Sequence, residues 1–309
     1  MEFGKAKANG TGKQGMGITV YHYDAFSAVP GKGNPAGVVL SADQLREGQM
    51  QEIAAEIGFN ETAFIVHSDV ADMRIRYFSP GHEMNLCGHA TVAGIFCMHE
   101  RDLLSGKEKI TIETRAGVLS LTIAETDSGV RIHMAQAAPE FIEYEGRKED
   151  LAALLGIGPE AIDDTLPVVY GSTGTWTLLV PVKDLPVFAD MKPQNEAFPS
   201  FLRQMPRSSV HPFCFLAEGA GRQVHSRHFS SPYSGTVEDP VTGTASGVIG
   251  CYYSNYVKPE QDTCFLVMEQ GHELGRDGEV QVYVDKTADG ISVSIAGTAV
   301  FVKEATVYV

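Results

Sequence analysis

Three places in the sequence carry ionisable side chains that suit proton transfer. Glu61 opens a run of strand-forming residues, residues 61–67, and a carboxylate there can take and return a proton. Cys87 and His89 lie two residues apart, and Asp239 lies far along the chain. If they meet, two carboxylates and an imidazole suit the abstraction of a proton from carbon and its return. Taken singly, Glu61 also fits a solvent-facing strand end, His89 a helix cap and Cys87 a buried small residue.

Two glycines stand just before helix-forming segments that have almost no polar face. Gly88 precedes residues 90–98 (ATVAGIFCM), and Gly243 precedes residues 244–253 (TASGVIGCYY), which begin with Thr244. A buried helix leaves backbone N–H groups unsatisfied at its N-terminus, so each start is a potential anion site. Two such starts facing each other would suit a carboxylate substrate, although each glycine alone also fits a tight turn.

The sequence lacks the common motifs for metals and nucleotide cofactors. His82, Cys87 and His89 do not follow a recurrent zinc spacing, and no fourth ligand is indicated, so we expect no metal. Residues 31–37 read GxGxxxG rather than GxGxxG, and a proline among them disfavours the helix of a dinucleotide site. Neither a GxxxxGKS/T loop nor a GxSxG elbow occurs. The residues therefore give no support for a metal or a nucleotide cofactor.

The composition limits the partners of the chain. In 309 residues, 24 Lys and Arg stand against 39 Asp and Glu, and the formal net charge is −15. Such a chain repels a phosphate backbone, so we expect no nucleic acid partner, whereas a small anion can still bind in a local site. The five cysteines are scattered, which favours a reducing compartment, and no apolar run is long enough for a membrane helix. We predict a cytoplasmic protein without a membrane segment.

The elements that must position these residues combine strands and helices. Alternation of apolar and polar side chains predicts strands at residues 72–78, 110–112, 119–123, 280–284 and 291–295. Turn residues between consecutive runs favour antiparallel hairpins. A surface helix is expected at residues 43–57, and the apolar segments 90–98 and 244–253 are typical of helices enclosed by sheet. The predicted fold class is α+β.

Two stretches about half the chain apart resemble each other. Residues 76–79 (RYFS) lead through a glycine-containing loop to the first apolar helix, and residues 227–230 (RHFS) lead in the same way to the second. This similarity indicates an internal duplication. We expect two pseudo-symmetric domains, residues 16–135 and residues 136–309, each a largely antiparallel sheet wrapped around a central apolar helix. In this scheme the last strand can cross back to the first domain.

The N-terminal segment differs from the rest of the chain. Residues 1–15 are rich in Gly and Lys and show almost no apolar pattern. Such a composition cannot bury enough apolar surface to fold, so we expect a disordered extension or a tag.

Four motifs in register resemble one family. They are residues 24–26 (DAF) with 33–37 (GNPAG), residues 60–64 (NETAF), residues 88–89 (GH) and residues 238–245 (EDPVTGTA). Together they resemble the PhzF, or phenazine biosynthesis PhzC/PhzF-like, family of isomerases and epimerases, and the resemblance runs from about residue 17 to the C-terminus. That family is similar in fold to diaminopimelate epimerase, with two related halves and an active site in the cleft between them.

The resemblance implies roles for the candidate residues. PhzF itself isomerises a dihydro-hydroxyanthranilate without a metal or an organic cofactor, and a glutamate carries the proton from one carbon to another. Carried over, Glu61 is the general base and acid. His89, Asp239 and Thr244 are then polar partners of the substrate. A homodimer is also expected from the family.

Three departures from PhzF limit this transfer. Thr244 stands where PhzF has serine, and Asn60 stands where serine is usual. Cys87 replaces an alanine and looks like the first active-site cysteine of diaminopimelate epimerase, whose two cysteines work on opposite faces of the substrate. The second cysteine is missing here, because the matching loop offers Asp239 and Thr242. A two-thiol epimerase is therefore disfavoured.

Three functions remain in view. The leading hypothesis is a cofactor-independent isomerase of a small carboxylate, with proton transfer by Glu61 and substrate contacts from Cys87 and from backbone donors at Gly88 and Gly243. The first alternative is an amino-acid or hydroxy-acid epimerase or racemase in which Glu61 or Cys87 works with Asp239. The second is a catalytically idle interaction module, which the set of ionisable residues disfavours.

Overall fold

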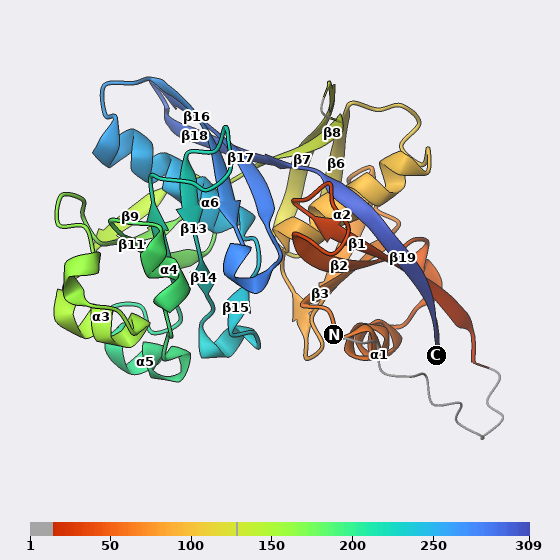
Figure 1. The fold of residues 1–309 in the computed structure, drawn as a ribbon. Coiled ribbons are helices and arrows are strands. Elements are labelled where there is room, and N and C mark those ends of the chain that lie inside the picture. The colour runs from red at the N-terminus through yellow and green to blue at the C-terminus, as the bar shows by residue number, and fades with distance from the viewer. Residues whose placement is uncertain (1–14, 128) are drawn as a thin grey trace.

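A computed structural model describes residues 15–127 and 129–309 (Figure 1). The expected extension, residues 1–15, lies outside the described residues except for Gly15. Just after it, the backbone groups of Met16 and Val309 exchange hydrogen bonds of 2.9 and 3.2 Å. The described chain therefore begins beside its own C-terminus.

The first part of the chain forms a sheet around one long helix. Its strands are β1 (Gly17–Ala25), β2 (Asn34–Val39), β3 (Glu61–Val66), β4 (Met73–Phe78), β5 (Glu83–Met84), β6 (Lys109–Thr114), β7 (Gly117–Thr126) and β8 (Gly129–Ala135). Its helices are a 3₁₀ turn (Ala42–Gln44), α1 (Glu47–Ile57) and α2 (Gly88–Glu100). The helix predicted from residue 43 begins later, because Leu45 and Arg46 are extended and the Arg46 amide donates to the Gln49 side chain at 3.0 Å.

The second part also contains many strands and one long buried helix, with more connections between them. Its strands are β9 (Glu140–Glu143), β10 (Val169–Ser172), β11 (Trp176–Pro181), β12 (Ser209–Cys214), β13 (Val224–Ser226), β14 (His228–Phe229), β15 (Glu238–Asp239), β16 (Thr263–Gln270), β17 (Gly278–Thr287), β18 (Gly290–Gly297) and β19 (Ala299–Tyr308). Its α-helices are α3 (Lys148–Leu155), α4 (Pro186–Asp190), α5 (Phe198–Phe201) and α6 (Gly243–Tyr252), which continues into a π turn (Tyr253–Val257). Further 3₁₀ turns lie at Pro159–Ala161, Asn195–Ala197, Pro232–Ser234 and His272–Leu274.

Strand pairing is mainly antiparallel, which confirms the predicted α+β class. The parallel pairs among the described strands are β2–β3, β4–β6, β11–β12 and β13–β16. The hairpins β6–β7 and β17–β18 turn where the sequence predicts. β8 pairs with β18, and β19 runs back to pair with β1, so the sheet is continuous between the parts that hold α2 and α6 (Figure 1). The division into residues 16–135 and 136–309 remains a proposal.

The two apolar helices lie where the sequence predicts them, and each starts at its glycine. In α6 every residue except Thr244 is buried, and in α2 the buried residues run from His89 to Met98 with Phe96 as the one exception. Burial on all sides fixes a helix without the help of a polar face. The N-termini of α2 and α6 are therefore held by packing along the whole helix.

The two similar stretches of sequence make the same local contacts. Arg76 binds Glu83 through Nε and Nη2 at 2.7 and 2.8 Å, and Arg227 binds Glu238 through the same atoms at 2.8 and 2.7 Å. Each guanidinium also lies over the phenylalanine ring two residues further on. Paired two-point contacts of this kind are strong and directional. They fasten β5 to β4 and β15 to β14, just before the starts of α2 and α6.

Phe26 joins the two parts through its backbone and its ring. Its φ of 63° is unusual for a bulky residue. Its amide donates to the Thr298 carbonyl at 2.7 Å, and its carbonyl accepts from the Glu279 amide at 2.8 Å. The buried ring lies beside Gly243 and Gly297, where an added Cβ would be 3.2 and 2.3 Å from ring carbons. Because hydrogen bonds and packing hold this strained residue from several sides, it forms a rigid junction beside the start of α6.

Gly297→Ala tests this junction. We expect it to lower the free energy of unfolding by about 1–3 kcal/mol, because the new methyl group would overlap the Phe26 ring. Urea unfolding measures the change. Gly48→Ala in α1 is the control, since open space surrounds Gly48 and alanine favours a helix. If Gly297→Ala and Gly48→Ala were equally stable, the junction would not be tightly packed.

Candidate active site

Glu61, His89 and Cys87 meet at the start of α2. Glu61 is the first residue of β3, His89 is the second residue of α2, and Cys87 is the N-cap of that helix. His89 Nε2 lies 3.2 Å from Glu61 Oε2, and His89 Nδ1 lies 3.4 Å from Cys87 Sγ. His89 and Cys87 are buried, whereas the Glu61 side chain is 17% exposed. One imidazole thus contacts a thiol and a carboxylate that a small molecule can still reach.

Asp239, on β15, is held from several sides. The Asn34 amide donates to Asp239 Oδ1 at 2.7 Å and to the Val241 carbonyl at 2.9 Å. The Thr242 hydroxyl donates to Asp239 Oδ2 at 2.6 Å. Gln270 donates to the backbone carbonyl of Asp239 at 2.7 Å. The orientation of this carboxylate is therefore fixed by side chains from the loop itself, from β2 and from β16.

Asn34 and Gln270 are site residues that the sequence analysis did not assign. The GNPAG motif that contains Asn34 could have indicated its role, but the acceptors of the Asn34 amide lie more than 200 residues away along the chain. Gln270 ends an ordinary strand and belongs to no motif. Only the folded chain shows that both residues converge on Asp239.

The ionisable groups of the site shift one another's pKa. Burial raises the pKa of Asp239; the charge of His89 lowers it and that of Glu61 raises it. Burial also raises the pKa of the Cys87 thiol, again with Glu61 adding to the shift and His89 opposing it. For His89, burial lowers the pKa, but contacts with Cys87 and Glu61 outweigh it, and the net pKa is raised well above 6.5. The site therefore holds an imidazole of raised pKa between a thiol of raised pKa and the Glu61 carboxyl group.

The pKa shifts also show that predicted site residues from both parts of the chain lie close together. Glu61 and His89 come from the first part of the chain and Asp239 comes from the second, yet both act on the pKa of Asp239. Thr244 is the one residue of α6 that is not buried, and its carbonyl accepts a hydrogen bond from Thr173 at 3.1 Å. The structure thus groups Glu61, His89 and Asp239, and it places Thr244 at the start of the neighbouring helix.

The starts of α2 and α6 differ in the room around them. Neither N-cap residue, Cys87 or Thr242, caps its helix through a side-chain hydrogen bond. At Gly88 an added Cβ would meet only one methyl group, at 3.4 Å, so space remains beside the N–H groups of α2. At Gly243 it would lie 2.5 Å from the Ile295 side chain, so this glycine permits close packing. The start of α2 is the better anion site of the two.

Within residues 15–127 and 129–309, two groups of side chains could hold a metal ion. Their ligand atoms lie within 4.8 Å of one another: Glu61 with Cys87 and His89, and His225 with Glu269 and His272. In the second group, His225 Nδ1 lies 2.8 Å from Glu269, and two backbone amides also bind that carboxylate. Hydrogen bonding accounts for this arrangement without a metal, so the expectation of a metal-free protein stays a prediction.

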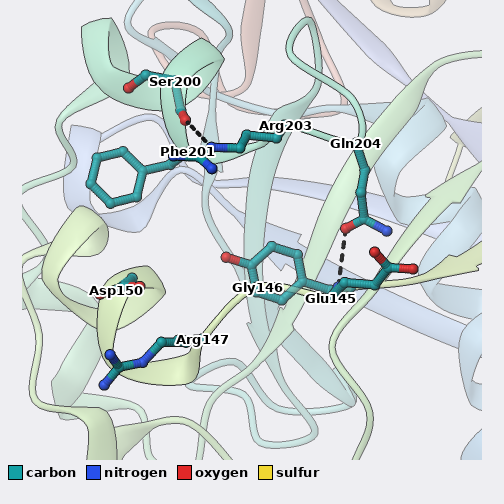
Figure 2. Close-up of a pocket in the computed structure, with 9 residues that line it drawn as sticks. Glu145, Gly146, Arg147, Asp150, Ser200, Phe201, Arg203 and Gln204 are labelled. Atoms are coloured by element: carbon teal, nitrogen blue, oxygen red, sulfur yellow. Dashed lines mark hydrogen bonds between the residues drawn. The ribbon is translucent and has the colours of Figure 1, made fainter.

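A cavity of ≈ 520 Å³ lies apart from these residues (Figure 2). It is lined by Tyr144, Glu145, Gly146, Arg147, Asp150, Ser200, Phe201, Arg203 and Gln204. Arg203 donates to the Ser200 carbonyl and the Glu145 amide donates to Gln204, so internal contacts shape its wall (Figure 2). It contains no candidate site residue, and the chemistry above does not depend on it.

Comparisons with known proteins define the class of this chain as an isomerase or epimerase enzyme. The uncharacterized isomerase YfhB of Bacillus subtilis is 48% identical over 282 residues, which cover 91% of this chain and 96% of that protein. The trans-2,3-dihydro-3-hydroxyanthranilate isomerase of Pseudomonas chlororaphis is 29% identical over 287 residues, which cover 91% and 97% of the two chains.

The chain belongs to the phenazine biosynthesis-like family, PhzC-PhzF, whose family model matches residues 23–305. The crystal structure of the PhzF-family phenazine biosynthesis protein from Bacillus anthracis has a TM-score of 0.93 and 51% sequence identity, and the match covers 95% of this chain and 100% of that one. These findings confirm the predicted family and enzyme class. Among the described residues, no helix is long and apolar enough to cross a membrane.

Asn34→Ala tests how Asp239 is held. The change should lower the free energy of unfolding by about 1–3 kcal/mol, because it leaves a buried carboxylate oxygen without its donor. Asn195→Ala is the matched control: this buried amide also donates to two oxygens, the carbonyls of Ser230 and Val237. Urea unfolding should show a loss in both variants. Carbon-13 NMR of the carboxyl groups should show a raised Asp239 pKa in Asn34→Ala alone, and an unchanged titration would exclude Asn34 as its support.

The Cys87 thiol should resist alkylation at neutral pH, because burial raises its pKa and thiolate is the reactive form. Mass spectrometry of iodoacetamide-treated protein should show its alkylation rate rising from pH 7 to pH 10 without a plateau. Cys264, which is more exposed, is the internal control and should react faster. Complete and pH-independent labelling of Cys87 at pH 7 would instead indicate a thiolate and favour the epimerase alternative.

Proposed function

We propose that this chain is a cofactor-independent isomerase of a small carboxylate substrate, with Glu61 as the group that moves the proton. The observation that carries the proposal is the 3.2 Å contact between Glu61 and His89 at the uncapped start of a buried helix. Glu61 is the more exposed member of the pair, so it is the one that can reach a substrate carbon. A carboxylate that serves as base and then as acid needs such access together with a fixed position.

The start of α2 supplies stabilisation for the charge that proton removal creates. When Glu61 takes a proton from a carbon near the substrate carboxylate, the electron pair left behind spreads onto oxygen. The His89 imidazolium and the N–H groups after Gly88 lie where they can stabilise that negative charge. Glu61 then returns the same proton to another carbon, and the double bond moves between them. One base suffices for such a shift on one face.

Asp239 is proposed to bind and orient a polar group of the substrate from the opposite part of the chain. Thr242 and Asn34 fix its two oxygens, and burial raises its pKa. A raised pKa makes the protonated form of this carboxyl group easier to reach than that of an exposed aspartate. Thr244, at the start of α6, is proposed to contact the same substrate.

The relatives suggest which substrates to try first. The Pseudomonas chlororaphis relative is named for trans-2,3-dihydro-3-hydroxyanthranilate, which is a carboxylate. At 29% identity, we propose this substrate class only as the starting point. A homodimer, a cytoplasmic location and an active site between residues 16–135 and 136–309 are parts of the same proposal.

An epimerase or racemase is the second candidate, and Cys87 is the reason to keep it. The Cys87 thiol lies 3.4 Å from His89, so the imidazole can form an ion pair with a thiolate at this position. Against it, burial raises the pKa of this thiol, and Thr242 rather than a cysteine is the N-cap at the start of α6. Glu61 working with Asp239 would be the other form of this alternative.

Glu61→Gln is the decisive variant. It should lower kcat by a factor of about 10²–10⁴, because the amide cannot take the proton, while the fold stays intact. The assay follows isomerisation of trans-2,3-dihydro-3-hydroxyanthranilate and related carboxylates in deuterated water. Glu113→Gln is the control, since Glu113 is also a partly exposed strand glutamate and pairs with Arg74. Turnover unaffected by Glu61→Gln would refute the proposal.

The same assay separates the alternatives. Isomerisation moves a double bond, whereas epimerisation introduces deuterium at a stereocentre and leaves the bonds in place. Cys87→Ala should keep most of the isomerase activity, and loss of turnover in that variant would support the thiol mechanism. A wild-type chain that turns over none of these carboxylates, yet binds a protein partner, would support the idle module.

A further inference from the structure

A second cavity, of ≈ 310 Å³, lies where the two parts of the chain meet. Residues 26–29 form part of its wall, and the charged or titratable side chains that line it are Lys32, Arg131, Arg222, His272, Asp277 and Glu279. None of Glu61, Cys87, His89 or Asp239 lines it. Its volume is at the lower end of the range for small-molecule sites, roughly 300–1,000 Å³.

The charge of this cavity is opposite to that of the chain. Acidic residues outnumber basic ones by 39 to 24 in the whole sequence. In the cavity, three permanently basic side chains and a histidine face two carboxylates. Lys32 and Asp277 lie 3.1 Å apart, are partly exposed, and neutralise each other's charge. The deeper part therefore contains two guanidinium groups and only the Glu279 carboxylate.

Arg131, on β8, is the most informative of these side chains. Its side chain is only 15% exposed, and its buried Nε has no hydrogen-bond partner among the described residues. Glu279 Oε1 lies 3.8 Å from Nη2, which is beyond hydrogen-bonding distance. Burial and the positive charge of Arg131 lower the pKa of His133. The buried Nε faces no open space, so an acceptor in the cavity would meet the Nη groups, which Glu279 does not reach at hydrogen-bonding distance.

Arg222 is also short of acceptors. Its Nη2 lies 3.4 Å from the other Glu279 oxygen, and its Nε lies 4.0 Å from Glu269. Glu269 is already bound to His225 at 2.8 Å and to two backbone amides. Glu279 is thus shared between two arginines, neither of which it meets in the two-point geometry that a guanidinium prefers. Both arginines keep N–H groups for another oxyanion.

We propose that this cavity is a binding site for a small dianion, held between Arg131 and Arg222. His272 also lines it, but its ring nitrogens lie 3.2 Å from Glu218 and 3.7 Å from Glu269 and are left out of the proposed site. Two guanidinium groups match a phosphate group or a pair of carboxylates, because planar N–H forks bind such oxygens in pairs. The site is separate from the proposed catalytic residues and does not depend on their function. It gives a strongly acidic chain one local place where a doubly charged metabolite can bind.

Titration calorimetry on the full chain tests this site with two probes, inorganic phosphate and malonate, at constant ionic strength set with sodium chloride. The wild type should bind one of them with 1:1 stoichiometry, and the stronger ligand identifies the source as a phosphate or a dicarboxylate. Arg131→Gln and Arg222→Gln should each weaken binding by at least about tenfold. Arg203→Gln, which removes an exposed arginine from the other cavity, should change affinity by less than about twofold.

One further variant and the choice of Arg222→Gln keep the test decisive. Glu61→Gln should bind the anion as the wild type does, which separates this cavity from the candidate active site. Arg222 is 34% exposed, so Arg222→Gln should fold even where the more buried Arg131→Gln is destabilised. No binding of either probe to the wild type, or equal binding by wild type and Arg222→Gln, would overturn the proposal.

Discussion

The hydrogen bond from Asn34 to Asp239 is the interaction on which the geometry of the candidate site depends. Asn34 begins β2, and two residues later Ala36 lies opposite Glu61 in the parallel pair β2–β3. The Asn34 side chain is fully buried and spans 2.7 Å to a carboxylate more than 200 residues away. Parallel pairing fixes Glu61 relative to Asn34, and the amide fixes Asn34 relative to Asp239. The distance between the two carboxylates is therefore set by the sheet and one side chain rather than by loop conformation.

The fold places acidic and basic groups together in a buried site, where desolvation disfavours the charged form of each. Desolvation alone lowers the pKa of His89 and raises those of Asp239 and Cys87. The charge of Cys87 and the contacts of the imidazole with Cys87 and Glu61 reverse the direction for His89 and raise its pKa. A buried imidazole of raised pKa beside a partly exposed carboxyl group can meet negative charge on a substrate without reorganisation of the site. Burial and the charge of Glu61 raise the pKa of the Cys87 thiol although the charge of His89 lowers it, so the net shift disfavours a thiolate and leaves Glu61 as the proposed base.

The sequence predicted the parts of this fold that depend on local pattern. The strands at residues 72–78 and 280–284 follow from hydrophobic periodicity. The two apolar helices follow from segments without a polar face, and the glycines before them mark their starts. The ionisable residues Glu61, His89 and Asp239 were found from residue type and family resemblance. The supports of Asp239 were not, because the partners of Asn34 and Gln270 are distant in sequence and no periodicity encodes them. The left-handed Phe26 was missed for a similar reason: its backbone partners, Thr298 and Glu279, lie far along the chain.

The two stretches that resemble each other show how one scaffold carries different chemistry. Phe78 lies opposite Glu83 and Phe229 lies opposite Glu238, and in both places a glycine five residues after the glutamate starts the buried helix. In this register Met84 takes the place of Asp239, and Cys87 takes the place of Thr242. A racemase that works with matched groups on both faces would need similar side chains at these positions. Here the start of α2 offers an imidazole and a thiol beside Glu61, and the loop before α6 offers a hydrogen-bonded carboxylate. Such asymmetry suits a reaction in which one side moves the proton and the other holds the substrate.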